Sequence, residues 1–220
     1  MSCKSIDKRL YIEVIGPTGS GKSTVINKIK EVLPDACVER RDRARGNLIN
    51  LFRSFLVWAC AVVRYRFIDQ NFQLLSRVMC FDAALSQANR KAGVDLFCVD
   101  EGIFHIATQH GFGKKIVFDV WCELVKARLK GLSNDILPII VVLSSSPDLR
   151  RQRLILRDNR KDKISNRNKK SYKLGHEFLT AHRLAMNITV LEFDNNTIED
   201  LDAIVIKVES TIRHIRERMR

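Results

Sequence analysis

The sequence lacks the features that mark several large classes of protein. Its six cysteines form no CxxC pair and have no close histidine partner, so neither a zinc site nor a redox motif is indicated. The longest apolar run, SFLVWACAVV at 54–63, has ten residues, whereas a membrane-spanning helix needs roughly 20. Internal repeats and low-complexity linkers are absent. We therefore expect one domain over 1–220 with free core thiols, in a reducing compartment such as the cytoplasm.

The first residues carry no pattern typical of a secretory signal. The apolar run YIEVI at 11–15 is five residues long and contains Glu13, which is too short and too polar for such a signal. We expect the chain to begin at its own N-terminus.

Negative charge is scarce relative to positive charge. The chain has 38 lysines and arginines against 25 acidic residues, which gives a net charge of +13. A partner that carries negative charge is therefore expected: nucleotide phosphates, nucleic acid or an anionic membrane surface. Net charge alone does not choose among the three.

Short apolar runs alternate with helix-like segments along the chain. A long helical stretch is expected at about 47–92, and five runs are expected to be strands: 11–15, 36–40, 95–100, 138–143 and 188–193. Strands separated by helices predict a parallel sheet with right-handed crossovers. The expected fold is a three-layer α/β/α sandwich around a five-stranded parallel sheet, in which ligands bind beyond the carboxyl ends of the strands.

A glycine-rich turn follows the first strand. The segment GPTGSGKS at 16–23 fits the pattern GxxxxGK[ST] at every fixed position and precedes a helix-like segment, STVINKIKEVL. Backbone N–H groups of such a turn surround phosphate oxygens, and the helix adds its positive N-terminal end. Lys22 is expected to reach the β and γ phosphates of ATP, and Ser23 to hold Mg²⁺. The predicted nucleotide-binding residues are Gly16, Pro17, Thr18, Gly19, Ser20, Gly21, Lys22, Ser23 and Thr24.

Two adjacent acids, Asp100 and Glu101, close the run at 95–100, and a glycine follows them. Because this run is expected to be a parallel strand, the Asp100 carboxylate should lie in the same crevice as the glycine-rich turn and hold Mg²⁺ through water. The role of Glu101 is open. It could activate water, as in ATPases, position an acceptor, or only bond a neighbouring arginine or helix terminus.

A helix with an arginine face is predicted after the run at 138–143. Ser146 suits the N-cap, Pro147 the first position and Asp148 the first turn. The spacing of Arg150, Arg153 and Arg157 places them on one helical face, away from the aliphatic side chains Leu149, Ile155 and Leu156. This face is typical of an anion clamp.

The segment 157–173 contains eight lysines and arginines against two aspartates. With only Ile164 and Tyr172 as bulky apolar residues, it cannot form a core, so we expect a mobile lid that closes over phosphates. Arginines in such a lid suit the charge of a transferring phosphoryl group, and closure keeps water from competing as acceptor. A solvated loop without a catalytic part is the alternative.

Four segments, taken in order, resemble the thymidylate kinase branch of the P-loop nucleotide kinases. They are KRLYIEVIGPTGSGKST at 8–24, LLSRVMCFDAALSQANRKAGVDLFCVDEG at 74–102, the spacing of Pro147, Arg153 and Arg157, and ITVLEFDNNTIEDLDAIVIKVESTI at 188–212. The resemblance covers nearly the whole chain, and it implies an ATP- and Mg²⁺-dependent kinase with a P-loop kinase sheet and a lid. It also implies a homodimer through the middle helices.

Two departures from the family lie on the acceptor side. Where the family has Asp-Arg, this chain has Asp100-Glu101, and where the family has Arg-Glu-Pro, this chain reads ERRD at 39–42. Thymidylate is therefore not indicated as the acceptor. From the resemblance, Glu39 or Asp42 is the expected contact or base for the acceptor, and Arg77 the expected contact with an acceptor nucleotide; a surface role is the alternative for each. His105 is a candidate for the acceptor pocket, with packing as the alternative.

The sequence alone is compatible with three functions. The leading one is a small-molecule kinase that acts on a nucleotide, a nucleoside or another hydroxylated metabolite. The second is an NTPase switch in which Glu101 activates water. The third is a nucleic-acid-binding protein or polynucleotide kinase, suggested by the net charge and the tail RHIRERMR at 213–220, although that tail also suits the last turns of a helix.

Overall fold

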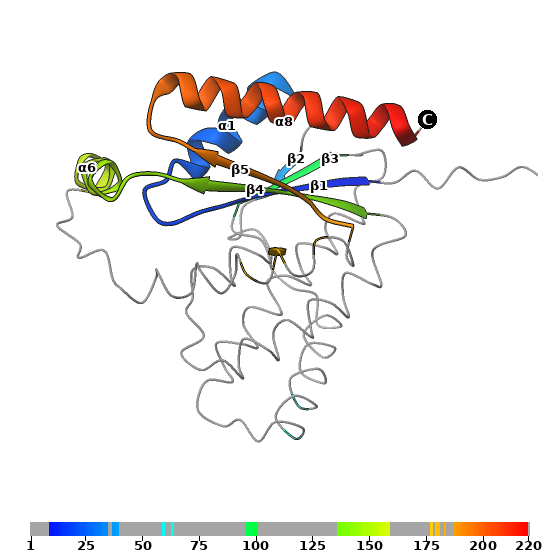
Figure 1. Ribbon diagram of the computed structural model, residues 1–220, viewed down its shortest axis with the longest axis horizontal. Coiled ribbons are helices and arrows are strands. Elements are labelled where there is room, and N and C mark those ends of the chain that lie inside the picture. The colour runs from blue at the N-terminus through cyan, green and yellow to red at the C-terminus, as the bar shows by residue number, and fades with distance from the viewer. Residues whose placement is uncertain are drawn as a thin grey trace, which may run out of the picture.

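The fold is described from a computed structural model of the chain (Figure 1). The structure describes residues 9–34, 37–39, 59, 63, 96–100, 136–158, 177, 179–180, 183 and 187–219. Within these ranges only the backbone is described for residues 37–39, 100, 136, 157, 158 and 219.

Within the described residues, five parallel strands form one sheet. They are β1 (Arg9–Ile15), β2 (Cys37–Glu39), β3 (Leu96–Asp100), β4 (Ile136–Ser144) and β5 (Thr189–Asp194). Their order across the sheet is β2-β3-β1-β4-β5, so the first strand of the chain lies at the centre. Each neighbouring pair is parallel, which brings the carboxyl ends of all five strands to one edge of the sheet.

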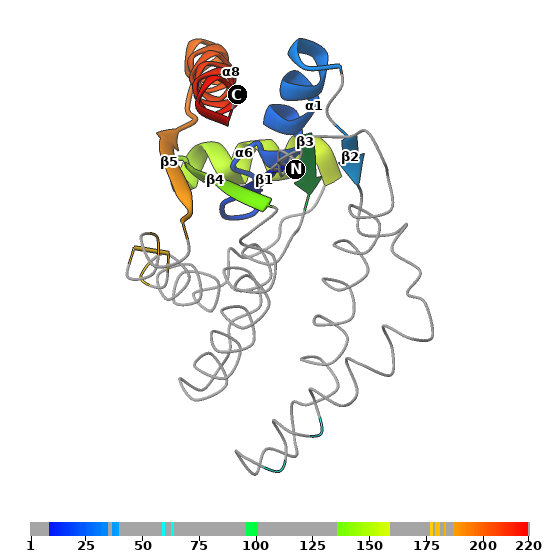
Figure 2. The ribbon, with the colours of Figure 1, turned by 90° about the vertical axis from the view of Figure 1, so that its right-hand side faces the viewer.

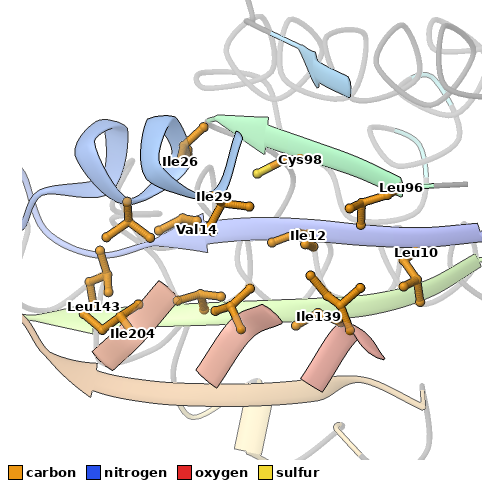
Figure 3. Packing of buried hydrophobic residues seen from close by; sticks show 14 residues of the cluster. Leu10, Ile12, Val14, Ile26, Ile29, Leu96, Cys98, Ile139, Leu143 and Ile204 are labelled. Atoms are coloured by element: carbon orange, nitrogen blue, oxygen red, sulfur yellow. The ribbon is translucent and has the colours of Figure 1, made fainter. Parts of the chain in front are cut away.

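In the part of the chain that the structure describes, α1 (Lys22–Val32) and α8 (Ile198–Met219) cover one face of the sheet. Both lie on the same side in Figures 1 and 2. Alternate residues of the strands point into the space between sheet and helices, because successive side chains of a strand point to opposite faces. The resulting core is drawn in Figure 3 and contains Leu10, Ile12, Val14, Val25, Ile26, Ile29, Leu96, Cys98, Ile139, Val141, Leu143, Ile204, Val208 and Ile212.

The opposite face of the sheet is buried as well. Tyr11 and Ile15 of β1 and Ile140 of β4 are buried on that face. Glu13 is also fully buried there and accepts a hydrogen bond of 2.8 Å from the hydroxyl of Tyr11. Burial of both faces explains why these strands read as continuous apolar runs.

The helix after β4 begins as its sequence predicts. Helix α6 (Pro147–Asp158) lies beyond the arrowhead of β4 in Figure 1. The Leu149 N–H donates to Ser146 Oγ at 3.3 Å, so Ser146 is the N-cap, Pro147 is the first residue and Asp148 lies in the first turn.

Helix α8 begins with a reciprocal pair of caps. The Asp200 N–H donates to Thr197 Oγ1 at 3.1 Å, and Asp200 Oδ2 accepts the N–H groups of Asn196 and Thr197, each at 2.9 Å. The basic tail continues this helix to Met219, as its alternative interpretation predicted.

The parallel α/β sheet predicted from the sequence is confirmed, with small shifts at the ends of strands. Strand β1 begins two residues before the expected 11–15, and β4 extends the expected 138–143 at both ends. Cys98 is a free, buried thiol, as expected. No helix in the described part of the chain is both long and apolar enough to cross a bilayer. Of the segment predicted as the lid, all but the backbone of residues 157 and 158 lies outside the described residues. The same holds for the long helical stretch at 47–92, apart from Ala59 and Val63.

Candidate functional site

The glycine-rich turn lies where β1 ends and α1 begins. A hydrogen bond of 3.1 Å from the Ser20 N–H to Pro17 O closes the turn, and Gly21 is the residue that precedes the helix. Because β1 is the central strand, the turn stands at the middle of the carboxyl edge of the sheet. Ligands of parallel sheets bind at this edge.

The glycines of the turn are required by conformation and by space. Gly19 and Gly21 have φ angles of 83° and 89°, which side chains rarely allow. A Cβ on Gly19 would stand 2.9 Å from Arg150 O, and a Cβ on Gly21 would collide with the side-chain amide of Asn195. At Gly16 the limit is space alone, since a Cβ there would stand 2.6 Å from Leu143 O. The pattern therefore reflects tight packing of the turn against neighbouring segments.

Lys22 supports the turn through its ammonium group. Its Nζ donates to Gly16 O at 3.0 Å and to Pro17 O at 3.2 Å, so the side chain reaches back across the turn. This places a positive charge beside the backbone that opens the turn. An anion held by the turn would be neutralised at short range.

The first turn of α1 fits a phosphate group. The leading N–H groups of a helix have no partner within the helix, and the dipole adds partial positive charge there. No acidic residue lies in the first turn of α1, while the side chains of Ser23 and Thr24 are exposed. Turn, ammonium group and helix end together form a site whose donors suit the oxygens of a polyphosphate.

The backbone of β3 brings Asp100 to the same edge of the sheet. Asp100 pairs with Val14, two residues before the glycine-rich turn, and Glu39 of β2 pairs with Val99. A hydroxyl and a carboxylate are oxygen ligands of the kind that Mg²⁺ prefers. The metal site predicted at Ser23 and Asp100 stays a prediction, because only the backbone of Asp100 is described. In the ranges that the structure describes, no group of three or more His, Cys, Asp or Glu residues is placed to hold a metal ion.

The arginine face of α6 packs against the turn. Arg150 is 8% exposed, and its backbone is the nearest neighbour of Gly19. Arg153 Nη1 donates to Asn195 O at 3.0 Å and, at 3.5 Å, to Gly19 O. Of the aliphatic side chains of the helix, Leu156 is 86% exposed and Leu149 is partly buried. The predicted grouping of the arginines therefore holds for Arg150 and Arg153.

Asn195 is a residue of this site that the sequence did not single out. It follows β5 directly and is buried, with its amide Nδ2 donating to Ser20 O at 2.8 Å. Its position in the sequence could have identified it, because the residue after a parallel strand lies at the ligand-binding edge of the sheet. The pair Asn195 and Asn196 after the last strand met that criterion.

Several predicted site residues lie outside the described residues, namely Asp42, Arg77, Glu101 and His105. For Glu39, Asp100 and Arg157 the backbone is described and the side chain is not. The roles predicted for these seven residues stay predictions.

Comparison with known proteins does not connect this site to a protein family. No protein-family model matches the chain, and no curated protein matches it. Geometry and chemistry therefore carry the functional argument.

Proposed function

We propose that the protein is an ATP- and Mg²⁺-dependent small-molecule kinase, similar to the thymidylate kinase family. The observation that supports this most strongly is the turn at 16–23. It joins the central strand to a helix, contains Gly19 and Gly21 with φ angles of 83° and 89°, and is bridged by the ammonium group of Lys22. These are the parts that a polyphosphate of a nucleotide requires.

Each part of the site has a distinct role in this proposal. The turn and Lys22 hold the donor phosphates, and Ser23 and Asp100 hold Mg²⁺, which neutralises phosphate charge when bound. Arg153 and Arg157 add positive charge on the other side of the transferred group. Catalysis then consists of positioning and charge neutralisation, and no covalent intermediate on the protein is needed.

Transfer is preferred to hydrolysis because of the cationic segment 157–173. A segment with eight lysines and arginines can close over the phosphates and exclude water from the reacting centre. We also propose that this lid and a third layer, which completes the sandwich, pack against the observed sheet. It also includes a cytoplasmic location and a homodimer through the middle helices.

The acceptor is proposed to bind on the side of β2 and β3. The backbone of Glu39 lies at the carboxyl edge, next to the strand that ends in Asp100. Glu39 or Asp42 serves as the base or acceptor contact, and Arg77 and His105 line the pocket. A nucleotide, a nucleoside or another hydroxylated metabolite is the class of acceptor that this proposal covers.

Labelled ATP tests the proposal directly. The protein is incubated with γ-labelled Mg-ATP and a panel of nucleosides, nucleoside monophosphates, sugar derivatives and an oligonucleotide with a free 5′ hydroxyl. Label is expected in one class of small acceptor and is expected to be lost in Lys22→Ala. Loss of ATP without any labelled acceptor would contradict the kinase and favour hydrolysis, and label in the oligonucleotide would favour a polynucleotide kinase.

A second candidate is an NTPase switch, because the residue that follows Asp100 in the sequence is a second acid, Glu101. In that case Glu101 activates water. Glu101→Gln would then abolish hydrolysis without acceptor while nucleotide binding survives. A kinase of the proposed type shows little hydrolysis before or after this substitution.

A further inference from the structure

Asn195 connects three parts of the molecule through three different hydrogen bonds. Its backbone N–H donates to Ser144 O at 2.9 Å, its backbone oxygen accepts from Arg153 Nη1 at 3.0 Å, and its side-chain Nδ2 donates to Ser20 O at 2.8 Å. It is 3% exposed, so these bonds are shielded from water. Only the third of them depends on the asparagine side chain.

The side-chain bond fixes one peptide of the glycine-rich turn. In a planar trans peptide the C=O and N–H groups point in opposite directions. When Asn195 holds the carbonyl of Ser20, the N–H of Gly21 must therefore point away from Asn195. That N–H immediately precedes α1, whose first N–H groups also have no partner within the helix.

Gly21 and Asn195 also depend on each other for space. A Cβ on Gly21 would collide with Nδ2 of Asn195, so the glycine leaves the volume that the amide occupies. The amide in turn must present its nitrogen, because an oxygen in that place would face the carbonyl oxygen of Ser20. The last glycine of the pattern is thus matched to a residue 174 positions later in the chain.

We propose that Asn195 is a positioning residue for phosphate binding, which holds the Ser20–Gly21 peptide so that the Gly21 N–H is directed at the bound polyphosphate. This inference rests on the proposed function. A donor that is fixed before the ligand arrives costs no ordering entropy on binding, whereas a peptide free to rotate does. Asn195 touches neither nucleotide nor acceptor in this role and acts through the turn.

The first test measures Mg-ATP affinity by calorimetry on the full chain. Asn195→Ala and the similarly sized Asn195→Leu both remove the donor and leave both backbone bonds of residue 195 in place. Each is expected to weaken binding about tenfold or more. Asn196→Ala is the matched control, because this exposed neighbour bonds Ser146 N–H instead of the turn, and it should stay within about twofold of the parent. Equal weakening in the control would overturn the specific role of Asn195.

The second test needs no nucleotide. Hydrogen exchange of the ligand-free protein is compared for the parent, Asn195→Ala and Asn195→Leu. The amides of Ser20 and Val25, which donate to Pro17 O and Gly21 O, are expected to exchange faster in both variants, while the amides of α8 keep their rates. If Asn195→Ala does not fold, the comparison is made between the parent and Asn195→Leu.

A double-mutant cycle tests the contact itself. Gly21→Ala is expected to lower the unfolding temperature more in the parent than in the Asn195→Ala background, where the colliding amide is gone. Strain from the φ of 89° remains in both backgrounds and cancels in the comparison. Equal shifts in the two backgrounds would contradict the contact.

These measurements separate the two proposals. If the parent binds no Mg-ATP, the proposed function fails, and the exchange rates and the cycle still decide whether Asn195 orders the turn. If the parent binds and both Asn195 variants bind equally well with unchanged exchange, the positioning role is overturned. A lower unfolding temperature with unchanged affinity and exchange would show a role in stability only, which also overturns it.

Discussion

Lys22 combines contact with the two carbonyls that open the glycine-rich turn and a full positive charge. Replacing it by alanine removes the bonds to Gly16 O and Pro17 O together with the charge that phosphate needs. We expect Lys22→Ala to lower the rate of phosphoryl transfer by about a hundredfold or more, as for the loss of one fixed donor to a reacting group. Steady-state kinetics with saturating acceptor measures this.

The control for Lys22 comes from the same helix. Lys28 is partly exposed and pairs with Asp202 of α8 at 3.5 Å. Lys28→Ala removes one positive charge with little effect on stability, because exposed ion pairs contribute about 0–1 kcal/mol. Kinetics equal to the parent is expected. A similar loss in both variants would mean that net charge, and not the position of Lys22, supports activity.

Asp200 gives a prediction for the dependence of stability on pH. The backbone N–H groups of Asn196 and then Thr197 donate to its carboxylate and lower the pKa of Asp200 below its ordinary range. A carboxylate with a lowered pKa in the folded state stabilises the fold above its unfolded pKa, and this contribution is lost as pH falls through the folded pKa. The parent should therefore unfold at a higher temperature than Asp200→Ala at pH 7.

The pH series provides the check on Asp200. The difference in unfolding temperature between parent and Asp200→Ala is expected to be constant from pH 7 to about pH 5 and to shrink below pH 4. A difference that grows on acidification would contradict the assignment. Thr197→Ala, which removes the other half of the reciprocal cap, should lower stability in the same direction.

At the scale of single residues, the sequence predicted what local patterns encode. The change from turn to helix after Gly21 and the cap at Ser146 are local, and the structure has both where the sequence predicted them. Asn195 was missed because its importance comes from Ser20, which is distant in the chain. The mutual fit of Gly21 and Asn195 is visible only once the fold brings them together.

Helix α8 shows at the scale of an element how one face of a helix stabilises the fold. Ile204 is 1% exposed and belongs to the core with β1 and α1, whereas Ile206 on the same helix is 66% exposed. Ile204→Ala is expected to lower the free energy of unfolding by about 2–5 kcal/mol, because it removes a buried side chain and leaves a cavity. Denaturant unfolding measures the change.

Ile206→Ala is the matched control for Ile204. The same chemical change on the exposed side of the helix should alter the free energy of unfolding by no more than about 0.5 kcal/mol. Comparable losses at the two positions would contradict the packing of α8 on the sheet.

For the elements, hydrophobic runs predicted the strands and the parallel sheet, because burial of both faces leaves a continuous apolar sequence. The facing of α6 was harder to predict. Periodicity placed its arginines on one side, but it could not show that this side meets Gly19 while Leu156 faces outward. The segment that packs against this face is a turn elsewhere in the chain. The periodicity of the helix sequence carries no information about that turn.

For the whole molecule, Mg-ATP is expected to stabilise the fold by mass action. At a concentration of about 100 times Kd, a ligand that binds only the folded state adds roughly 2.7 kcal/mol. For a chain of this length that corresponds to an increase of about 5–10 °C in Tm. Thermal unfolding with and without Mg-ATP measures the shift, and Lys22→Ala should lose most of it. An unchanged Tm of the parent at millimolar Mg-ATP would count against nucleotide binding.

The central place of β1 in the sheet has a consequence for synthesis of the chain. Leu10 of β1 pairs with Leu96 of β3 on one side and with Leu137 of β4 on the other. The ribosome must add roughly 86 residues after Leu10 before the first of these partners exists, which takes about 4–17 s at usual elongation rates. During that interval an apolar strand is already exposed to the cell without its neighbours, so a newly made chain needs protection from aggregation before its sheet can form.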